Sequence, residues 1–154
     1  MSAGPFACGM PTLSETYIEN RQRVQPNHAN NYDSVHGGNL MKWMDEVGAM
    51  SAMRFAGEPC VTAAVDEFSF ERPIPVGETA VIQSYVFDAG RSSAQVFLRA
   101  YREDPLTGER AKTTEARFTF VAVDADGAPV GVPTLEVETE NERELQATAR
   151  ELTD

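Results

Sequence analysis

Hydrophobic and polar positions follow two different periods along this chain. Between residues 38 and 55 the period is helical, because Leu40, Met44, Val47 and Ser51 fall on one stripe of a helix wheel. After this segment the period changes to two, and turn-rich sequences separate four segments that alternate or run apolar. These four segments are residues 60–70, 79–89, 93–103 and 111–125.

Together these elements predict one α+β domain. Residues 15–24 alternate more weakly and predict a further strand, while residues 140–154 predict a charged terminal helix. Four strands at hairpin spacing predict an antiparallel meander, which becomes with the first strand a five-stranded sheet covering one long central helix. We therefore expect a flexible tail at 1–13, the folded domain at 14–135 and an acidic helix or tail at 136–154.

Composition narrows the class of protein. A chain of 154 residues with 42% apolar residues is typical of a single globular domain. It shows no apolar run long enough to span a membrane and no secretory leader, so we expect a cytoplasmic protein. Cys8 and Cys60 lie far apart and indicate free thiols, with Cys60 serving in packing. Only His28 and His36 offer imidazole ligands, so we expect no metal site.

The charge balance excludes one class of partner. Asp and Glu number 24 against 13 Lys and Arg, a net charge of −11, and only Lys42 and Lys112 are lysines. Such a chain repels nucleic acid. An acidic, lysine-poor surface suits a cytoplasm of very high salt, where screening weakens self-repulsion. A halophilic host is therefore one interpretation, and an ordinary acidic protein is the other.

One carboxylate in the predicted helix needs an explanation. Asp45 lies off the apolar stripe, on a side that it shares with Met41, Gly48, Ala49 and Ala52. Aspartate is a poor helix former and is costly to bury without a partner. It either meets a structural partner or solvent, or it lies in a cleft as a general base or nucleophile.

The helix start offers a second chemical group. His36, Gly37 and Gly38 precede the apolar stripe, and unpaired amides at a helix start can polarise a carbonyl. His36 either orients a substrate or caps the helix. Gly37 and Asp45 lie eight residues apart, about 12 Å along a helix axis, too far for one carbonyl to reach both. If they cooperate, Asp45 comes from the antiparallel helix of a second copy, and a dimer carries two composite sites.

A turn between two predicted strands is the last candidate. Arg91 follows a glycine and precedes two hydroxyl side chains, Ser92 and Ser93. An Arg-Ser-Ser turn can hold phosphates through charge-assisted hydrogen bonds. The alternative is a surface turn with an incidental arginine.

Several of these stretches together resemble a known family. "NNYDSVHGGNLMKWMDEVGAMSA" resembles the helix of hotdog-fold acyl-CoA thioesterases, in the branch of the bacterial broad-range and animal cytosolic acyl-CoA hydrolases. "VTAAVDEFSFERPIPVGE", "AGRSSAQVFLRAYRED" and "TTEARFTFVAVDADG" resemble the strands that follow in that branch. The resemblance covers residues 15–133, with the same order and spacing.

The resemblance implies a long helix wrapped by a five-stranded antiparallel sheet. Such chains pair into double-hotdog homodimers that assemble further into tetramers or hexamers. The implied activity, in fatty acid metabolism, is hydrolysis of acyl-CoA to free acid and CoA without metal or prosthetic group. Asp45 matches the carboxylate that activates water or attacks the thioester, and Gly37 or Gly38 matches the amides that polarise its carbonyl. Arg91, Ser92 and Ser93 match the turn that contacts CoA.

Two departures from the family pattern concern the positioning of water. Many relatives carry Asn or Asp where this chain has Ser34, with Asp33 beside it, and we expect Asn30 to take over a polar role. Some branches carry Ser or Thr where this chain has Ala49. A non-catalytic acyl-CoA-binding or sensing protein remains the alternative from another class. A hotdog hydratase or dehydratase is disfavoured, because no histidine follows His36.

Overall fold

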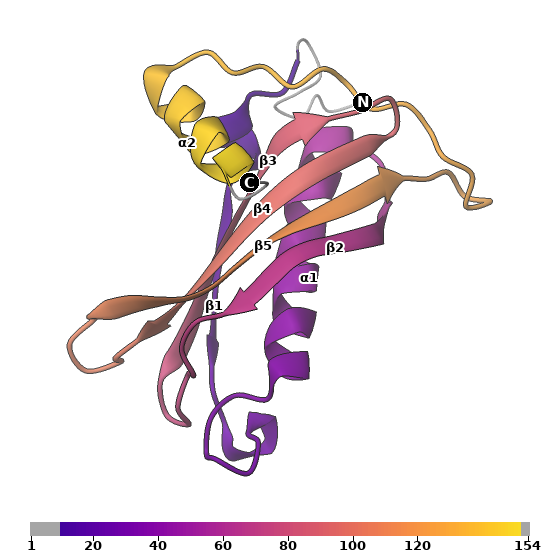
Figure 1. The fold of residues 1–154 in the computed structure, drawn as a ribbon. Helices are drawn as coiled ribbons and strands as arrows, with labels where there is room; N and C mark the ends of the chain where they lie inside the picture. The colour runs from indigo at the N-terminus through magenta and orange to yellow at the C-terminus, as the bar shows by residue number, and fades with distance from the viewer. Residues whose placement is uncertain (1–9, 152–154) are drawn as a thin grey trace.

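The computed structural model describes residues 10–151, and a curved five-stranded antiparallel sheet dominates it (Figure 1). The long helix α1 (Gly37–Ala56) lies against one face of the sheet, and the short helix α2 (Glu140–Glu151) lies against the other. This is the predicted hotdog fold. The strands are β1 (Ile18–Arg23), β2 (Cys60–Phe70), β3 (Thr79–Ala89), β4 (Ser93–Glu103) and β5 (Arg110–Ala122). Two short 3₁₀ helices, Leu13–Thr16 and Pro26–His28, flank β1.

The order of strands in the sheet corrects one prediction. A meander of four strands in chain order is wrong, because the sheet runs β1-β3-β4-β5-β2. Only β3, β4 and β5 are joined as hairpins, while β2 pairs with β5 and β1 pairs with β3. The segment between β2 and β3 contains Pro73 and Pro75 and does not form a hairpin turn. β2 is therefore an edge strand, and its outer backbone groups meet no other strand in the described chain.

Helix α1 is placed by its apolar stripe. Leu40, Met44, Val47, Ser51 and Phe55 are buried against the concave face of the sheet, as the helical period predicts. His36 caps the first turn, and Gly57 ends the helix in a left-handed conformation (φ 69°).

The small residues on the Asp45 side of α1 predict close approach by another backbone or a ligand, but two of them pack against the sheet of their own chain. Gly48 and Ala52 are buried under the same chain's sheet. A Cβ built on Gly48 would lie 3.2 Å from side-chain atoms of Leu98 and Phe120, so this glycine permits close helix–sheet packing. Gly48 therefore does not open a path for a second helix, and of the four residues that share this side with Asp45 only Ala49 and Met41 remain partly or fully exposed.

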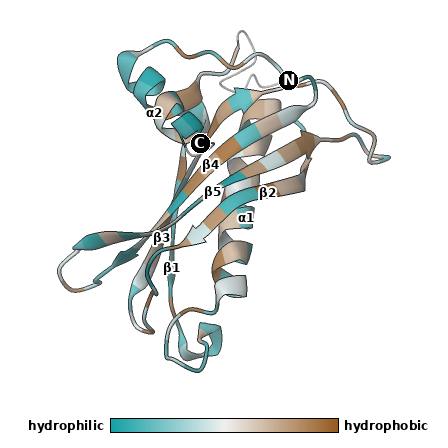
Figure 2. Cartoon of the chain, viewed as in Figure 1, coloured by the Kyte–Doolittle hydropathy of each residue, from teal (hydrophilic) through white to brown (hydrophobic). Residues whose placement is uncertain are grey.

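The convex face carries a second, smaller core. Leu13, Tyr85, Phe87, Phe97 and Ala149 are buried there, which joins the N-terminal segment, the sheet and α2. The remaining surface of α2 is mainly hydrophilic, as Figure 2 shows. The predicted C-terminal helix is thus present. Residues 1–9 and 152–154, including Cys8, lie outside the described residues.

A buried carboxylate fastens α2 to the N-terminal segment. Glu142 is only 2% exposed and accepts hydrogen bonds from the backbone N–H groups of Ser14, Glu138 and Thr139 at 2.8–3.0 Å. Burial alone would raise its pKa, but these donors outweigh burial and lower the pKa from 4.5 to about 2. The folded chain therefore stabilises the ionised form of Glu142.

Replacing Glu142 by glutamine should destabilise the fold. The lowered pKa corresponds to about 3 kcal/mol of stability, present above the unfolded-state pKa near 4.5 and lost as the pH falls from there to about 2. We expect Glu142→Gln to lower the free energy of unfolding by about 2 to 3 kcal/mol at pH 7, measured by urea denaturation. The gap from wild type should narrow below pH 4.5. Glu144→Gln is the matched control, because that side chain is exposed on the same helix.

Candidate functional site

The start of α1 presents one open backbone donor. The Gly38 N–H donates to Nδ1 of His36 at 3.0 Å, so the cap already uses this amide. The N–H groups of Asn39 and Leu40 donate to the His36 carbonyl. In the part of the chain that the structure describes, the Gly37 N–H meets no acceptor. Of the two amides expected to polarise a carbonyl, the structure leaves Gly37 free and assigns His36 to capping.

Asn30 lies in the loop before this helix and has one side-chain group to spare. Its Oδ1 accepts hydrogen bonds from the N–H groups of Tyr32 at 2.8 Å and Ser34 at 3.2 Å. These two donors fix the orientation of the amide. The Asn30 Nδ2 group is therefore turned away from the loop and remains able to donate to a ligand.

Asn30 and Gly37 border the same cavity. It has a volume of about 330 Å³, and its other walls include Leu40, Phe70 and Arg72. The ring of Phe70 covers the helix start, since a Cβ on Gly37 would lie 3.3 Å from its Cζ atom. Gly37 and Asn30, each with an unused hydrogen-bond donor, thus line a partly apolar space. Such an arrangement suits a carbonyl that carries an apolar group.

Asp45 lies on α1 beside the edge strand β2. The hydroxyl of Thr62 donates to its Oδ1 at 2.5 Å. No ion pair of Asp45 occurs among the described residues, so a structural salt bridge is not its role. The two side chains border a cavity of about 350 Å³, together with Met41, Lys42 and Val65 among others. One carboxylate oxygen is held, and the other has no hydrogen-bond donor among the described residues.

Sequence reasoning did not single out Thr62. A threonine in an alternating strand is ordinary, and its hydroxyl acquires a function only through the neighbouring helix. A signal existed in the pairing of β2 with β5: Thr62 lies opposite Phe120, which faces the helix, so Thr62 faces the helix too. That pairing was not predicted, and neither was the contact.

Asp45 and the donors at Asn30 and Gly37 do not meet within one chain. The eight-residue separation along α1 places them about 12 Å apart along the axis, and they line different cavities. The Asp45 cavity reaches only as far as Gly38, whose N–H is engaged. If these groups act together, the Asp45 of the site must come from a second copy of the chain.

The turn at residues 90–92 lies at the end of the fold opposite the helix start (Figure 1). Ser93 is paired with Val121 and Phe70 with Thr114, seven residues away along β5, which is roughly 23 Å. Arg91 is exposed, and its carbonyl accepts from the Val132 N–H. The turn is thus near the level of Thr62 and Asp45 in the sheet, but not near Gly37 of the same chain.

Comparison with known proteins identifies the family. The sequence profile described as the thioesterase superfamily matches residues 32–109, half of the chain. The chain belongs to the thioesterase superfamily. This confirms the family expected from the helix and strand motifs.

Individual relatives of this thioesterase support the same family assignment. It is 38% identical over 135 residues to the uncharacterised acyl-CoA thioester hydrolase YkhA of Bacillus subtilis, covering 88% of this chain and 78% of YkhA. An acyl-CoA hydrolase from Staphylococcus aureus, solved with butyryl-CoA, CoA and CoA disulfide, superposes with a TM-score of 0.85 at 31% identity, covering 94% and 88% of the two chains. A hexameric acyl-CoA thioesterase superposes with a TM-score of 0.84 at 33% identity, covering 94% of each chain.

The Staphylococcus aureus hydrolase has also been solved as three alanine variants. They replace an asparagine, an aspartate and a threonine, and successive replaced positions are 15 and 17 residues apart in sequence.

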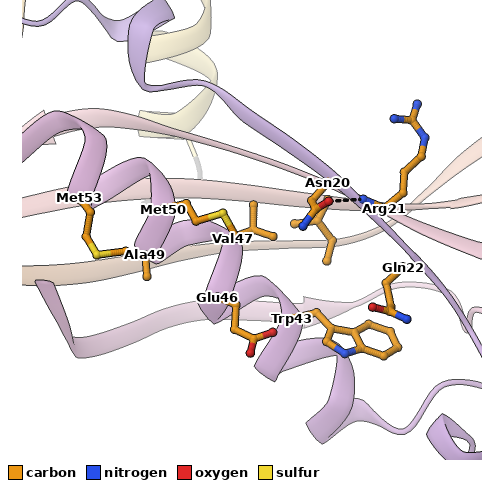
Figure 3. Close-up of a pocket in the computed structure, with 10 residues that line it drawn as sticks. Asn20, Arg21, Gln22, Trp43, Glu46, Val47, Ala49, Met50 and Met53 are labelled. Atoms are coloured by element: carbon orange, nitrogen blue, oxygen red, sulfur yellow. Dashed lines mark hydrogen bonds between the residues drawn. The ribbon is translucent and has the colours of Figure 1, made fainter. Parts of the chain in front are cut away.

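A cavity larger than the two bordered by Gly37 and Asp45 lies away from these groups. Its volume is about 530 Å³, and it lies between the outer side of α1 and strand β1. Figure 3 shows Trp43 and Met50 on the helix facing Gln22 and Asn20 on the strand, and Glu46 also lines the cavity. Neither Asp45 nor Gly37 borders it. Size alone therefore does not mark the reactive site.

Two further findings concern the role of Cys60 and the prediction of no membrane-spanning segment. Cys60 is half-buried against the core, where burial, aided by Glu58, raises the pKa of its thiol, so it suits packing rather than nucleophilic attack. No helix in the described part of the chain is long and apolar enough to cross a membrane.

Proposed function

We propose that this thioesterase hydrolyses fatty acyl-CoA to a free acid and CoA, with Asp45 as the reacting carboxylate. The observation that carries the proposal is the pair of Asp45 and Thr62 beside an open cavity. The spacing of the Staphylococcus aureus variants supports it, because Asn30, Asp45 and Thr62 are likewise 15 and 17 residues apart (45 − 30 and 62 − 45). No metal or prosthetic group is part of the proposed reaction.

The proposed active unit is a homodimer formed through β2. Val61 and Phe70 on this strand are 51% and 55% exposed, and such an apolar free edge is a template for pairing with another chain. A second copy of β2, antiparallel across a two-fold axis near Val65, would continue the sheet. The Thr62 end of one strand would then lie beside the Phe70 end of the other.

This pairing would complete the site. Asp45 and Thr62 of one chain would approach Gly37 and Asn30 of the other, and the Arg91 turn of the first chain would lie on the side where CoA enters. The hexameric relative supports further assembly of such dimers. We propose a role for Arg91, Ser92 and Ser93 in binding the phosphates of CoA.

In the proposed mechanism, the Gly37 N–H and the Asn30 amide donate to the thioester carbonyl oxygen and stabilise the charge that develops there. The Thr62 hydroxyl holds one oxygen of Asp45, which leaves the other free to act. As a base, this oxygen takes a proton from water while the water oxygen bonds to the carbonyl carbon. Collapse of the tetrahedral intermediate breaks the carbon–sulfur bond, and the CoA sulfur recovers the proton. As a nucleophile, the same oxygen would instead bond to the carbonyl carbon and expel the CoA thiolate, giving an anhydride; water would then hydrolyse the anhydride to the free acid and the regenerated carboxylate, and the released proton would go to the thiolate.

A thiol-release assay over acyl-CoAs of several chain lengths tests the function. Release of free CoA at turnover rates is expected, and it should be measured in both low and high salt because of the acidic surface. Binding of acyl-CoA without thiol release would instead indicate a sensing protein. Cytoplasmic location and a halophilic host remain predictions.

Replacing Thr62 by valine should weaken catalysis without loss of the fold. Valine keeps the shape and removes the donor to Asp45, a hydrogen bond to a charged group worth about 1.5 to 3 kcal/mol. We expect kcat to fall by roughly 10- to 100-fold with little change in KM, measured by thiol release from butyryl-CoA. Thr62→Ser restores the hydroxyl and should recover most of the rate. Equal loss in the serine and valine variants would contradict a role for the hydrogen bond.

A further inference from the structure

Strand β2 contains an irregularity close to the helix start. Asp66 pairs with Arg117 and Ser69 with Glu115, so three steps on β2 match two on β5. The extra residue makes a β-bulge. Within it, Glu67 adopts a left-handed backbone conformation with φ 54°, which a non-glycine residue keeps only where the surroundings enforce it.

The bulge changes which side chains face the helix. Val65 lies opposite Phe118 on the concave face, so strict alternation would put residues 67 and 69 on that face as well. The extra residue reverses the alternation, and Phe68 and Phe70 turn to the concave face instead. Phe68 packs against the core, and the ring of Phe70 lies 4.8 Å from it, centroid to centroid.

The bulge is held from the neighbouring strand. Arg117 on β5 forms an ion pair with Glu67 at 3.1 Å. Bulges of this kind commonly redirect a side chain next to a reactive site. Here the redirected side chain is Phe70.

The Phe70 ring packs on Phe68 and lies over the start of α1 rather than inside the core. The residue is 55% exposed, yet its Cζ lies 3.3 Å from the place of a Cβ on Gly37. A Cβ is about 2.5 Å from its own nitrogen, so the ring edge is at most about 6 Å from the Gly37 nitrogen. A carbonyl oxygen bound to that N–H would lie about 2.9 Å from the nitrogen, and the cavity of about 330 Å³ that Gly37 and Phe70 both line would then hold the carbonyl and its attached carbons together with the ring edge.

We propose that Phe70 is a specificity-determining residue that forms the wall of the acyl subsite beside the reacting carbonyl. This inference rests on the proposed function, in which the Gly37 N–H binds the thioester. The flat ring leaves room for a straight acyl chain along its edge. A methyl branch on the carbon next to the carbonyl would press against it. The enzyme therefore prefers straight acyl groups to those branched at this carbon.

The test compares two substrates of equal carbon number, butyryl-CoA and isobutyryl-CoA, by thiol release. In Phe70→Ala, the ratio of kcat/KM for isobutyryl-CoA over butyryl-CoA should rise at least about tenfold above wild type. The ratio for Phe70→Leu should lie between those of wild type and Phe70→Ala. The ratio for Phe70→Trp should fall below that of wild type. Leu106→Ala is the control, because it also shortens an exposed apolar side chain but lies in the β4–β5 hairpin, outside the cavity that Gly37 and Phe70 line, and it should leave the ratio within twofold.

The outcomes separate this inference from the proposed function. An unchanged ratio in variants that still turn over butyryl-CoA would overturn the role of Phe70 and leave the hydrolase intact. Absence of thiol release by wild type with every acyl-CoA would remove the proposed function and this inference with it. If Phe70→Ala loses its fold, shown by thermal melting, the ratio must still decrease from leucine through phenylalanine to tryptophan, and any other order rejects the proposal.

Discussion

Replacing Asp45 by asparagine should reduce kcat for acyl-CoA hydrolysis by about 10²- to 10⁴-fold. Asparagine keeps the size of the side chain and can still accept from Thr62, but it can neither take a proton from water nor attack a carbonyl. A general base contributes roughly 10²- to 10⁴-fold, and a nucleophile contributes at least as much. The measurement is single-substrate kinetics by thiol release, with the oligomeric state followed by size-exclusion chromatography.

Glu46→Gln is the matched control for this variant. Glu46 is the neighbouring carboxylate on α1, about 100° round the helix, and borders the large outer cavity instead of the one at Thr62. We expect its kcat to stay within twofold of wild type. A comparable loss in both variants would indicate a general electrostatic effect, and near-normal turnover in Asp45→Asn would defeat the assignment.

The sequence predicted local elements well and their pairing poorly. Strands β2, β3 and β4 begin and end where the alternation indicated, and α1 differs by a single residue at each end, because periodicity is a local property of the chain. The pairing of β2 with β5 was not predictable in this way. It joins Cys60 to Ala122 across 62 residues, and no local signal specifies such a contact.

The candidate site shows the same contrast between local features, which the sequence indicates, and long-range contacts, which it does not. Asp45 was identified because a carboxylate on a side of the helix that is otherwise small and apolar contradicts local propensity, which is a signal in the sequence itself. Thr62 contradicts nothing in its strand, and only the packing of β2 against α1 gives it a partner. Likewise, His36 and Gly38 form a capping pair that leaves Gly37 as the open donor, a distinction that depends on side-chain orientation.

Mixing two inactive variants should restore activity if each site draws on two chains. Asn30→Asp keeps the Oδ1 acceptor that orders its loop, but it replaces the donor amide by a charge that repels the developing oxyanion. Asp45→Asn lacks the reacting carboxylate. In a mixed dimer, one site combines both defects, while the other combines an intact Asn30 from one chain with an intact Asp45 from the other.

Random exchange of chains makes half of the dimers mixed, and each mixed dimer has one of its two sites intact. The mixture should therefore recover about a quarter of wild-type activity per chain, far above either parent. Co-expression with two different affinity tags isolates the mixed species, in which the recovery should be about half. A mixture of Asp45→Asn with Asp45→Ala is the control and should stay inactive, since no combination supplies a carboxylate. If the mixture of Asn30→Asp and Asp45→Asn is no more active than either variant alone, the whole site lies within one chain. That result would contradict the proposed dimer, which follows from the separation of about 12 Å between Gly37 and Asp45 along α1.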